Sequence, residues 1–195
     1  MSIFLSSLLA LQPVLAGSIT GKIRAAGFEP AGAVVYLLAE PADSLAASPD
    51  TAVIDQRDIA FLPRVSAIRP GTVVRFRNSD PILHNVFSPA GPGPGFDLGT
   101  YPSPGVRERV IGETGVHVIL CHVHPEMAAF VVVVPTPYRA VSEPDGSFAI
   151  FGVPPGRYQL HVWRRLAAPV EREILITSGR TVEVEIQLVP ARRRR

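Results

Sequence analysis

The side chains best suited to metal or redox chemistry are concentrated between Cys121 and Met127. This stretch holds the only cysteine, two of the five histidines and one of the two methionines of the 195-residue chain. Cys121, His124 and Met127 follow the spacing C-x2-H-x2-M. A thiolate, an imidazole and a thioether suit copper, whereas Mg²⁺ and Ca²⁺ prefer oxygen ligands and structural zinc requires a second Cys/His pair. The spacing therefore indicates a copper site.

These three residues must lie on a loop to reach one ion. In a regular strand, neighbouring side chains point to opposite faces, and alternate residues lie about 6.6 Å apart. Pro125, directly after His124, favours such a loop. The apolar run from Ala128 to Val134 that follows is typical of a buried strand.

A further donor is expected from the segment "FRNSDPILHNVFSP", in which His84 follows a proline-containing turn. With His84, Cys121 and His124 as main ligands and Met127 as a long axial ligand, the set is that of a blue-copper electron-transfer site. We predict one mononuclear copper ion, with the donor atoms of the three main ligands about 2 to 4 Å apart.

The other three histidines are not expected to bind this ion. His122 should point away from its neighbour Cys121 on leaving the strand. His117 lies four residues upstream, about 13 Å along an extended strand, and His161 falls in another part of the chain. A buried cysteine or methionine alone would indicate only core packing, so the copper prediction depends on the joint pattern.

The N-terminus predicts export. Ile3 to Leu15 is mostly apolar, and small residues precede Gly17, although no Lys or Arg comes before the run. We interpret residues 1–16 as a signal peptide and expect a soluble periplasmic or secreted protein without stable membrane insertion. An unpaired thiol in an oxidising compartment indicates a specific role for it.

The chain carries a small net charge of +2, and its one basic cluster is the tail at residues 191–195, which includes Arg192 to Arg195. We expect this tail to be solvated and expect no nucleic-acid partner.

Strands are expected throughout, because 20 prolines and 16 glycines are spread along the chain and no helical period of 12 residues occurs. We predict a copper-binding domain over residues 17–136. It includes a first strand pair at 17–27 and 32–40, three short strands within 51–80 and a long loop at 88–105. In the segment 72–77, Val74 and Phe76 should face inward, with Arg75 and Arg77 outward.

A second domain is predicted over residues 137–190, after Pro135 and Pro137 end the apolar run. The Asp145-Gly146 turn lies between alternating segments, and four strands are expected at 147–151, 156–163, 171–177 and 181–189. About 50 residues bury little core, so this sandwich should pack against the first domain.

The arrangement N-x5-H-N-V-F, a long loop, then G-x5-C-x2-H-P-x-M and a valine-rich strand resembles the cupredoxins. Over residues 52–134 it is closest to the plastocyanin and amicyanin group and to methylamine-utilisation-like exported proteins. The resemblance implies a Greek-key β-sandwich, copper ligands at His84, Cys121, His124 and Met127, and an Asn85 side chain that ties the two ligand loops together. "SEPDGSFAIFGVPPGRYQLHVW" resembles a carboxypeptidase-regulatory or transthyretin-like sandwich and implies only a second all-β fold.

Several functions remain open. The first is a monomeric one-electron carrier, not an enzyme, with a redox partner protein of unknown identity. In it His84 is covered, while His124 reaches the surface within an apolar patch of Pro89, Pro125 and Ala128. The second is copper delivery or storage with help from His122. A thiol enzyme with Cys121 as nucleophile has no evident orienting group, and a metal-free interaction module would not need the complete ligand set.

Overall fold

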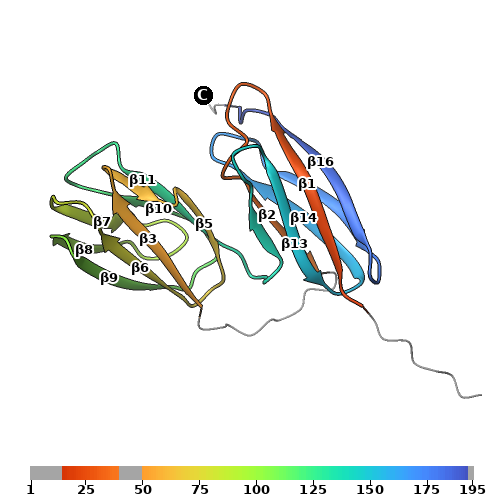
Figure 1. Cartoon of the computed structure of the whole chain (residues 1–195), viewed down its shortest axis with the longest axis horizontal. Helices are drawn as coiled ribbons and strands as arrows, with labels where there is room; N and C mark the ends of the chain where they lie inside the picture. Colours follow the sequence, from red (N-terminus) through yellow and green to blue (C-terminus); the bar gives the residue numbers. More distant parts are fainter. Residues whose placement is uncertain (1–14, 40–49, 193–195) are drawn as a thin grey trace, which may run out of the picture.

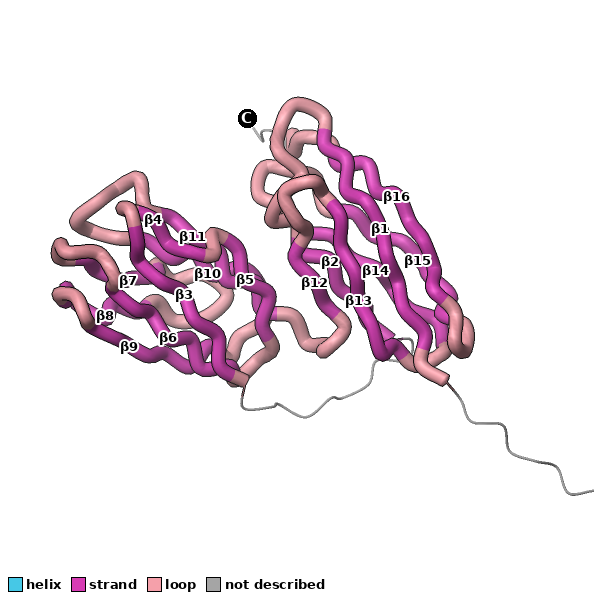
Figure 2. The backbone as a smooth tube through the Cα atoms, viewed as in Figure 1, coloured by secondary structure: helices cyan, strands magenta, loops and turns pink. Residues whose placement is uncertain are grey.

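The structure, a computed structural model, describes residues 15–39 and 50–192. This part of the chain is built from strands and connecting loops (Figure 2), and none of it is a helix long and apolar enough to cross a bilayer. The predicted all-β class is confirmed. Of the signal peptide predicted at residues 1–16, only Leu15 and Ala16 are described, and of the basic tail at 191–195, only Ala191 and Arg192.

The strands form two sandwiches that lie side by side (Figure 1). The first sandwich packs a five-stranded sheet of order β5-β11-β10-β7-β8 against a four-stranded sheet of order β4-β3-β6-β9. Its strands are β3 (Thr51–Arg57), β4 (Ala60–Leu62), β5 (Val65–Ile68), β6 (Thr72–Asn78), β7 (His84–Ser88), β8 (Phe96–Tyr101), β9 (Gly105–Ile111), β10 (Gly115–Leu120) and β11 (Ala128–Val133).

The second sandwich combines a three-stranded sheet of order β13-β1-β16 with a four-stranded sheet of order β12-β2-β14-β15. Its strands are β1 (Gly17–Ala25), β2 (Val34–Ala39), β12 (Arg139–Val141), β13 (Ser147–Val153), β14 (Gly156–Trp163), β15 (Val170–Ile176) and β16 (Thr181–Leu188). The strands after Pro137 do not form a sandwich of their own, because this sandwich also contains β1 and β2 from the other end of the chain.

The prediction that residues 17–39 belong to the copper domain is wrong. β1 pairs in parallel with β16 and antiparallel with β13, and β2 pairs antiparallel with β14 and β12. In Figure 1 the red β1 accordingly lies beside the blue β16. The first sandwich therefore begins at β3.

Burial explains this arrangement. The C-terminal strands alone form a set too small to bury a sizeable core, and β1 and β2 supply fully covered apolar side chains to it. Ile19, Ile23 and Leu37 are all 0–1% exposed within the cluster that fills the second sandwich. Burying a side chain of this size stabilises a fold by about 1.5–3 kcal/mol, so these strands are a large part of the second core.

Apolar and charged residues alternate along β6, and the strand turns its apolar side chains inward as predicted. Val74 and Phe76 are buried, and Arg75 and Arg77 are exposed. The predicted loop at 88–105, however, contains the strand β8, which pairs with β7. The dense run of glycine and proline ends at Gly95, and the strand that follows it contains only one further glycine, Gly99.

An apolar contact joins the two sandwiches. Val34 of β2 forms one buried cluster with Val132 and Val134 at the end of β11. Arg139 crosses the same boundary, and its Nε donates to the carbonyl oxygen of Ala67 at 3.0 Å. Burial lowers the pKa of Arg139 below its ordinary value. The second sandwich is thus packed on the first through these contacts.

Candidate metal centre

Two neighbouring strands of the five-stranded sheet bring the predicted ligands together. His84 is the first residue of β7, and Cys121 follows the last residue of β10. These strands pair antiparallel, with Leu120 opposite Phe87, so the start of β7 lies beside the chain that leaves β10. His124 lies three residues further along, in the loop to β11.

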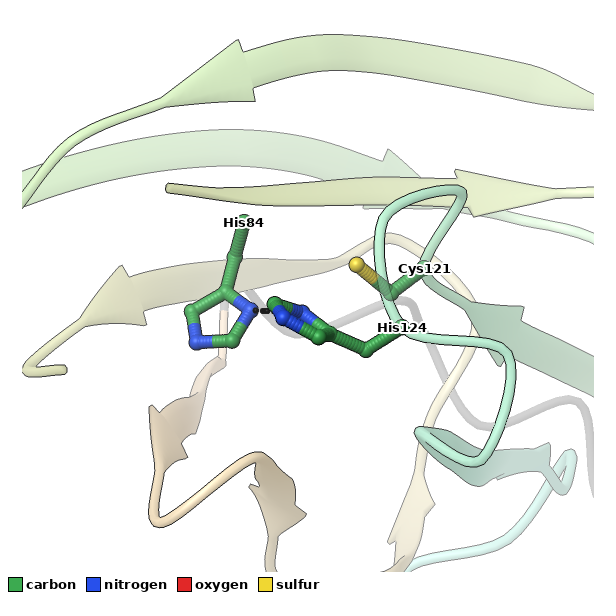
Figure 3. A group of neighbouring side chains, drawn as sticks. All are labelled: His84, Cys121 and His124. Atoms are coloured by element: carbon green, nitrogen blue, oxygen red, sulfur yellow. Dashed lines mark hydrogen bonds between the residues drawn. The ribbon is translucent and has the colours of Figure 1, made fainter. Parts of the chain in front are cut away.

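The donor atoms of His84, Cys121 and His124 all lie within 4.8 Å of one another (Figure 3). The two Nδ1 atoms of His84 and His124 are 3.1 Å apart, inside the expected range of 2 to 4 Å, whereas the 4.8 Å that bounds all three donors is wider than that range. Within residues 15–39 and 50–192, this is the one group of three or more His, Cys, Asp or Glu side chains close enough to hold a metal ion.

The three side chains differ in their exposure to solvent. His84 is 0% exposed and Cys121 is 4% exposed, whereas the His124 ring is only half-buried. A thiol and an imidazole in a dry site, with a second imidazole at its edge, favour an ion held away from water that keeps one contact with the surface.

Met127 is the last residue of the ligand loop, directly before β11. Its backbone N–H donates to the carbonyl oxygen of His124 at 3.0 Å, which makes the turn that Pro125 was expected to favour. Its side chain is 1% exposed and packs in the core of the first sandwich beside Cys121. The loop thus places a buried thioether one turn after His124.

Asp80 was not predicted as part of the site. Its Oδ2 lies 2.7 Å from Nε2 of His84, and the carboxylate also accepts from the backbone N–H groups of Asp58 at 2.7 Å and Ile59 at 3.0 Å. A carboxylate acceptor keeps the ring proton of His84 on Nε2 and leaves the lone pair of Nδ1 facing Cys121 and His124.

The pKa of Asp80 is held below its ordinary value. Burial alone raises it, but the hydrogen bonds from Ile59, His84 and Asp58 together outweigh burial. Asp80 is therefore ionised at neutral pH, as its role toward His84 requires. The sequence offers only an acidic residue four positions before the histidine, a spacing that by itself indicates no more than a solvated turn.

Asn78 fixes the turn that carries Asp80. It is 2% exposed, its Nδ2 donates to the carbonyl oxygens of Ile82 at 2.9 Å and Tyr101 at 3.0 Å, and its Oδ1 accepts from the N–H of Asp80. The asparagine six positions before His84 is thus a structural part of the site.

Asn85 links both ligand segments. Its backbone N–H points to Sγ of Cys121 at 3.4 Å, and its side-chain Oδ1 accepts from the backbone N–H of His122 at 3.3 Å. Its Nδ2 donates to Asp97 at 2.7 Å. Hydrogen bonds from Gly99 and from Asn85 hold the pKa of Asp97 below its ordinary value. These contacts place the thiol relative to the histidine segment.

The remaining histidines lie outside the three-residue group. The ring of His122 stacks on Phe87, with centroids 3.7 Å apart, and lies 3.4 Å from Oδ2 of Asp97. His117 pairs with the carbonyl oxygen of Glu113. His161 stacks on Tyr36 in the second sandwich.

Exposed apolar side chains stand next to the ligands in the sequence. Ile82, Leu83 and Val123 are 40%, 53% and 45% exposed and directly neighbour the ligands in sequence. Pro125 is also exposed. Pro89, expected in this patch, follows the opposite end of β7 from His84, roughly 16 Å away along the strand, so it does not contribute.

Comparison with known proteins gives one kind of match. No protein-family model and no curated protein sequence matches the chain. Among solved structures, amicyanin from Paracoccus versutus is 21% identical, with a TM-score of 0.41, and the match covers 50% of this chain and 91% of amicyanin. A purple cupredoxin from Nitrosopumilus maritimus is 26% identical, with a TM-score of 0.39, over 43% of this chain and 99% of the cupredoxin.

The role of Asp80 can be tested by Asp80→Asn, with Asp58→Asn as the control. We expect Asp80→Asn to weaken binding of a metal at His84 by about 10- to 100-fold, because the amide no longer fixes the ring proton as a carboxylate does. Asp58 is an exposed residue of the adjacent turn with a φ of 54°, which asparagine tolerates. Isothermal titration with Cu²⁺ measures both affinities, and equal affinities would remove Asp80 from the site.

Proposed function

We propose that the chain is an exported type 1 copper protein that carries single electrons to or from a redox partner protein. The observation that supports this most directly is the convergence of two imidazole Nδ1 atoms and one thiol sulfur within 4.8 Å, in a largely dry site. Two imidazoles and a thiolate, with a thioether nearby, match the donor set of blue-copper sites.

The donor residues fit one copper ion, held by His84, Cys121 and His124, with Met127 as a weak axial ligand. Bound copper supplies one-electron chemistry by alternating between Cu(I) and Cu(II). The neighbouring residues orient the ligands and keep water away from them. Asp80 keeps the proton of His84 on Nε2, the backbone N–H of Asn85 donates toward the thiolate of Cys121, and the buried side chains exclude water.

Export rests on the N-terminal sequence. The apolar run from Ile3 to Leu15 is followed by Gly17, the first residue of β1, so cleavage after Ala16 would leave the second sandwich complete. N-terminal sequencing of the protein recovered from the periplasm or medium tests this, and a retained Met1 contradicts it.

The visible spectrum tests the copper site. We expect the purified chain with Cu²⁺ to show an intense thiolate-to-copper charge-transfer band, and Cys121→Ser to lose that band, because the serine hydroxyl is not a soft anionic donor. The matched control is His122→Ala, at the adjacent exposed position, which should retain it. A Cu²⁺ complex without the band would rule out the type 1 assignment, and loss of the band in His122→Ala would assign a ligand role to His122.

We expect Met127 to affect the reduction potential of the copper more than its affinity. Met127→Leu keeps the side-chain volume, so copper should stay bound while the reduction potential shifts, because a weak axial thioether chiefly sets the potential. Ile119→Leu is the control for repacking, since Ile119 lies in the same core. Redox titration compares the variants. Loss of copper from Met127→Leu would make Met127 a main ligand, and a shift no larger than the control's would remove it from the set.

Copper delivery or storage is the second candidate, and it is favoured by the exposed His122 beside Cys121. An electron carrier should exchange electrons between its own molecules, because His124 is only half-buried and exposed apolar residues such as Leu83 neighbour the ligands in sequence. We expect rapid self-exchange by NMR line broadening, slowed about tenfold or more by Leu83→Glu, since like charges then repel in the encounter.

Leu175→Glu is the matched control, because Leu175 is equally exposed on β15 of the second sandwich. Its self-exchange should equal that of the unchanged protein. Negligible self-exchange in the unchanged, copper-loaded protein would favour delivery or storage over electron transfer.

A further inference from the structure

A groove between the two sandwiches runs along the ligand loop. Its volume is about 760 Å³, and its walls include Pro125 of the ligand loop, Ala128 of β11, Arg64 of the first sandwich, and Arg164 and Arg165 of the second. Pro125 directly follows His124, the half-buried imidazole. The groove therefore reaches the residue next to this ligand.

Positive charge prevails in this groove. Three guanidinium groups line it against two carboxylates, Glu29 and Glu126. In the part of the chain that the structure describes, Arg64, Arg164 and Arg165 form no ion pair, whereas Arg69 and Arg139 at the nearby domain boundary both contact Asp50. The charges of Arg64 and Arg165 are therefore available to an outside anion, whereas the charge of Arg164 interacts with Glu29.

Arg164 is held by the second sandwich, and Arg165 packs on a ring of the first. Arg164 donates from Nε to the carbonyl oxygen of Ala31 at 2.7 Å and from Nη2 to that of Glu29 at 3.1 Å. The guanidinium of Arg165 lies over the ring of Phe130, 5.6 Å from its centroid. Burial, and then the charge of Arg165, lowers the pKa of Arg164 below its ordinary value. Fixed guanidinium groups lose little freedom when they bind carboxylates.

We propose that this groove docks an acidic surface segment of the redox partner protein, beside the exposed edge of His124. The inference rests on the proposed electron-carrier function and adds to it the chemistry of the partner. A groove of this volume accommodates several side chains, guanidinium groups pair with carboxylates in two-pronged contacts, and complementary charge raises the rate of encounter.

Arg64 and Arg165 supply the test, because Arg164 also bonds to the backbone and its replacement would disturb the fold. We expect a hexaglutamate peptide to bind the full chain saturably at low salt, as measured by calorimetry. Binding should weaken with added salt and fall about tenfold or more in Arg64→Gln/Arg165→Gln. Arg172→Gln/Arg180→Gln, two exposed positions on the second sandwich, should bind as the unchanged protein does, and hexalysine should not bind.

Trp163 gives a local readout that does not depend on electron transfer. Its ring lies 5.7 Å from that of Phe130, which Arg165 covers, so a bound peptide should change its fluorescence in the unchanged protein and not in Arg64→Gln/Arg165→Gln. Equal peptide affinity in the two double variants would overturn the proposal. So would binding of inorganic phosphate or of phosphatidylserine vesicles, but not of the peptide, because the groove would then serve a small anion or a membrane.

The two proposals fail separately. Peptide binding is measured on the full chain as purified, whether or not copper is present. A chain that binds hexaglutamate at the groove but gives no charge-transfer band overturns the copper function and leaves an acidic partner. A chain that gives the band but does not bind the peptide retains the copper site and loses the docking inference.

Discussion

The site depends on the distance that a metal ion imposes on its ligands. Bonds of about 2.0 to 2.3 Å require donors from separate segments to meet within a few ångströms. Antiparallel pairing of β7 with β10 brings His84 beside Cys121, and the turn from His124 to Met127 returns the second imidazole to them. The remainder of the first sandwich holds these two segments in register.

Hydrogen bonds then orient the ligands that the strands bring together. Asn78 holds the turn, Asp80 holds the His84 ring, and Asn85 connects β7 with the chain after Cys121. Each of these side chains is at least nine-tenths buried, where an unpaired polar group is costly. The network therefore favours one arrangement of donors, which suits a centre that changes its charge without changing its ligands.

The second sandwich gives the molecule a feature that a single copper domain would not have. Its contact through Val34, Val132 and Val134 leaves a groove open beside the ligand loop. Arginines from both sandwiches line that groove, so the pairing of the domains determines where this positive charge lies. Packing at the domain boundary thus shapes the surface beside the ligand loop.

The local features of this protein follow from its sequence, and the pairing of distant segments follows only from its tertiary structure. The C-x2-H-x2-M spacing and the alternation of β6 depend on neighbouring residues, so the loop and the inward face of Val74 and Phe76 were predictable. His84 was predicted as a ligand because the other three residues leave the copper site one imidazole short. The position of β1 and β2 was not predictable from local pattern, because their apolar faces fit either sandwich. Only the core of the C-terminal strands, too small to be stable alone, decides that these two strands complete it. Asp80 was missed for a related reason. A carboxylate before a turn is ordinarily solvated, and its role arises from backbone N–H groups of Asp58 and Ile59 that the fold brings from another hairpin.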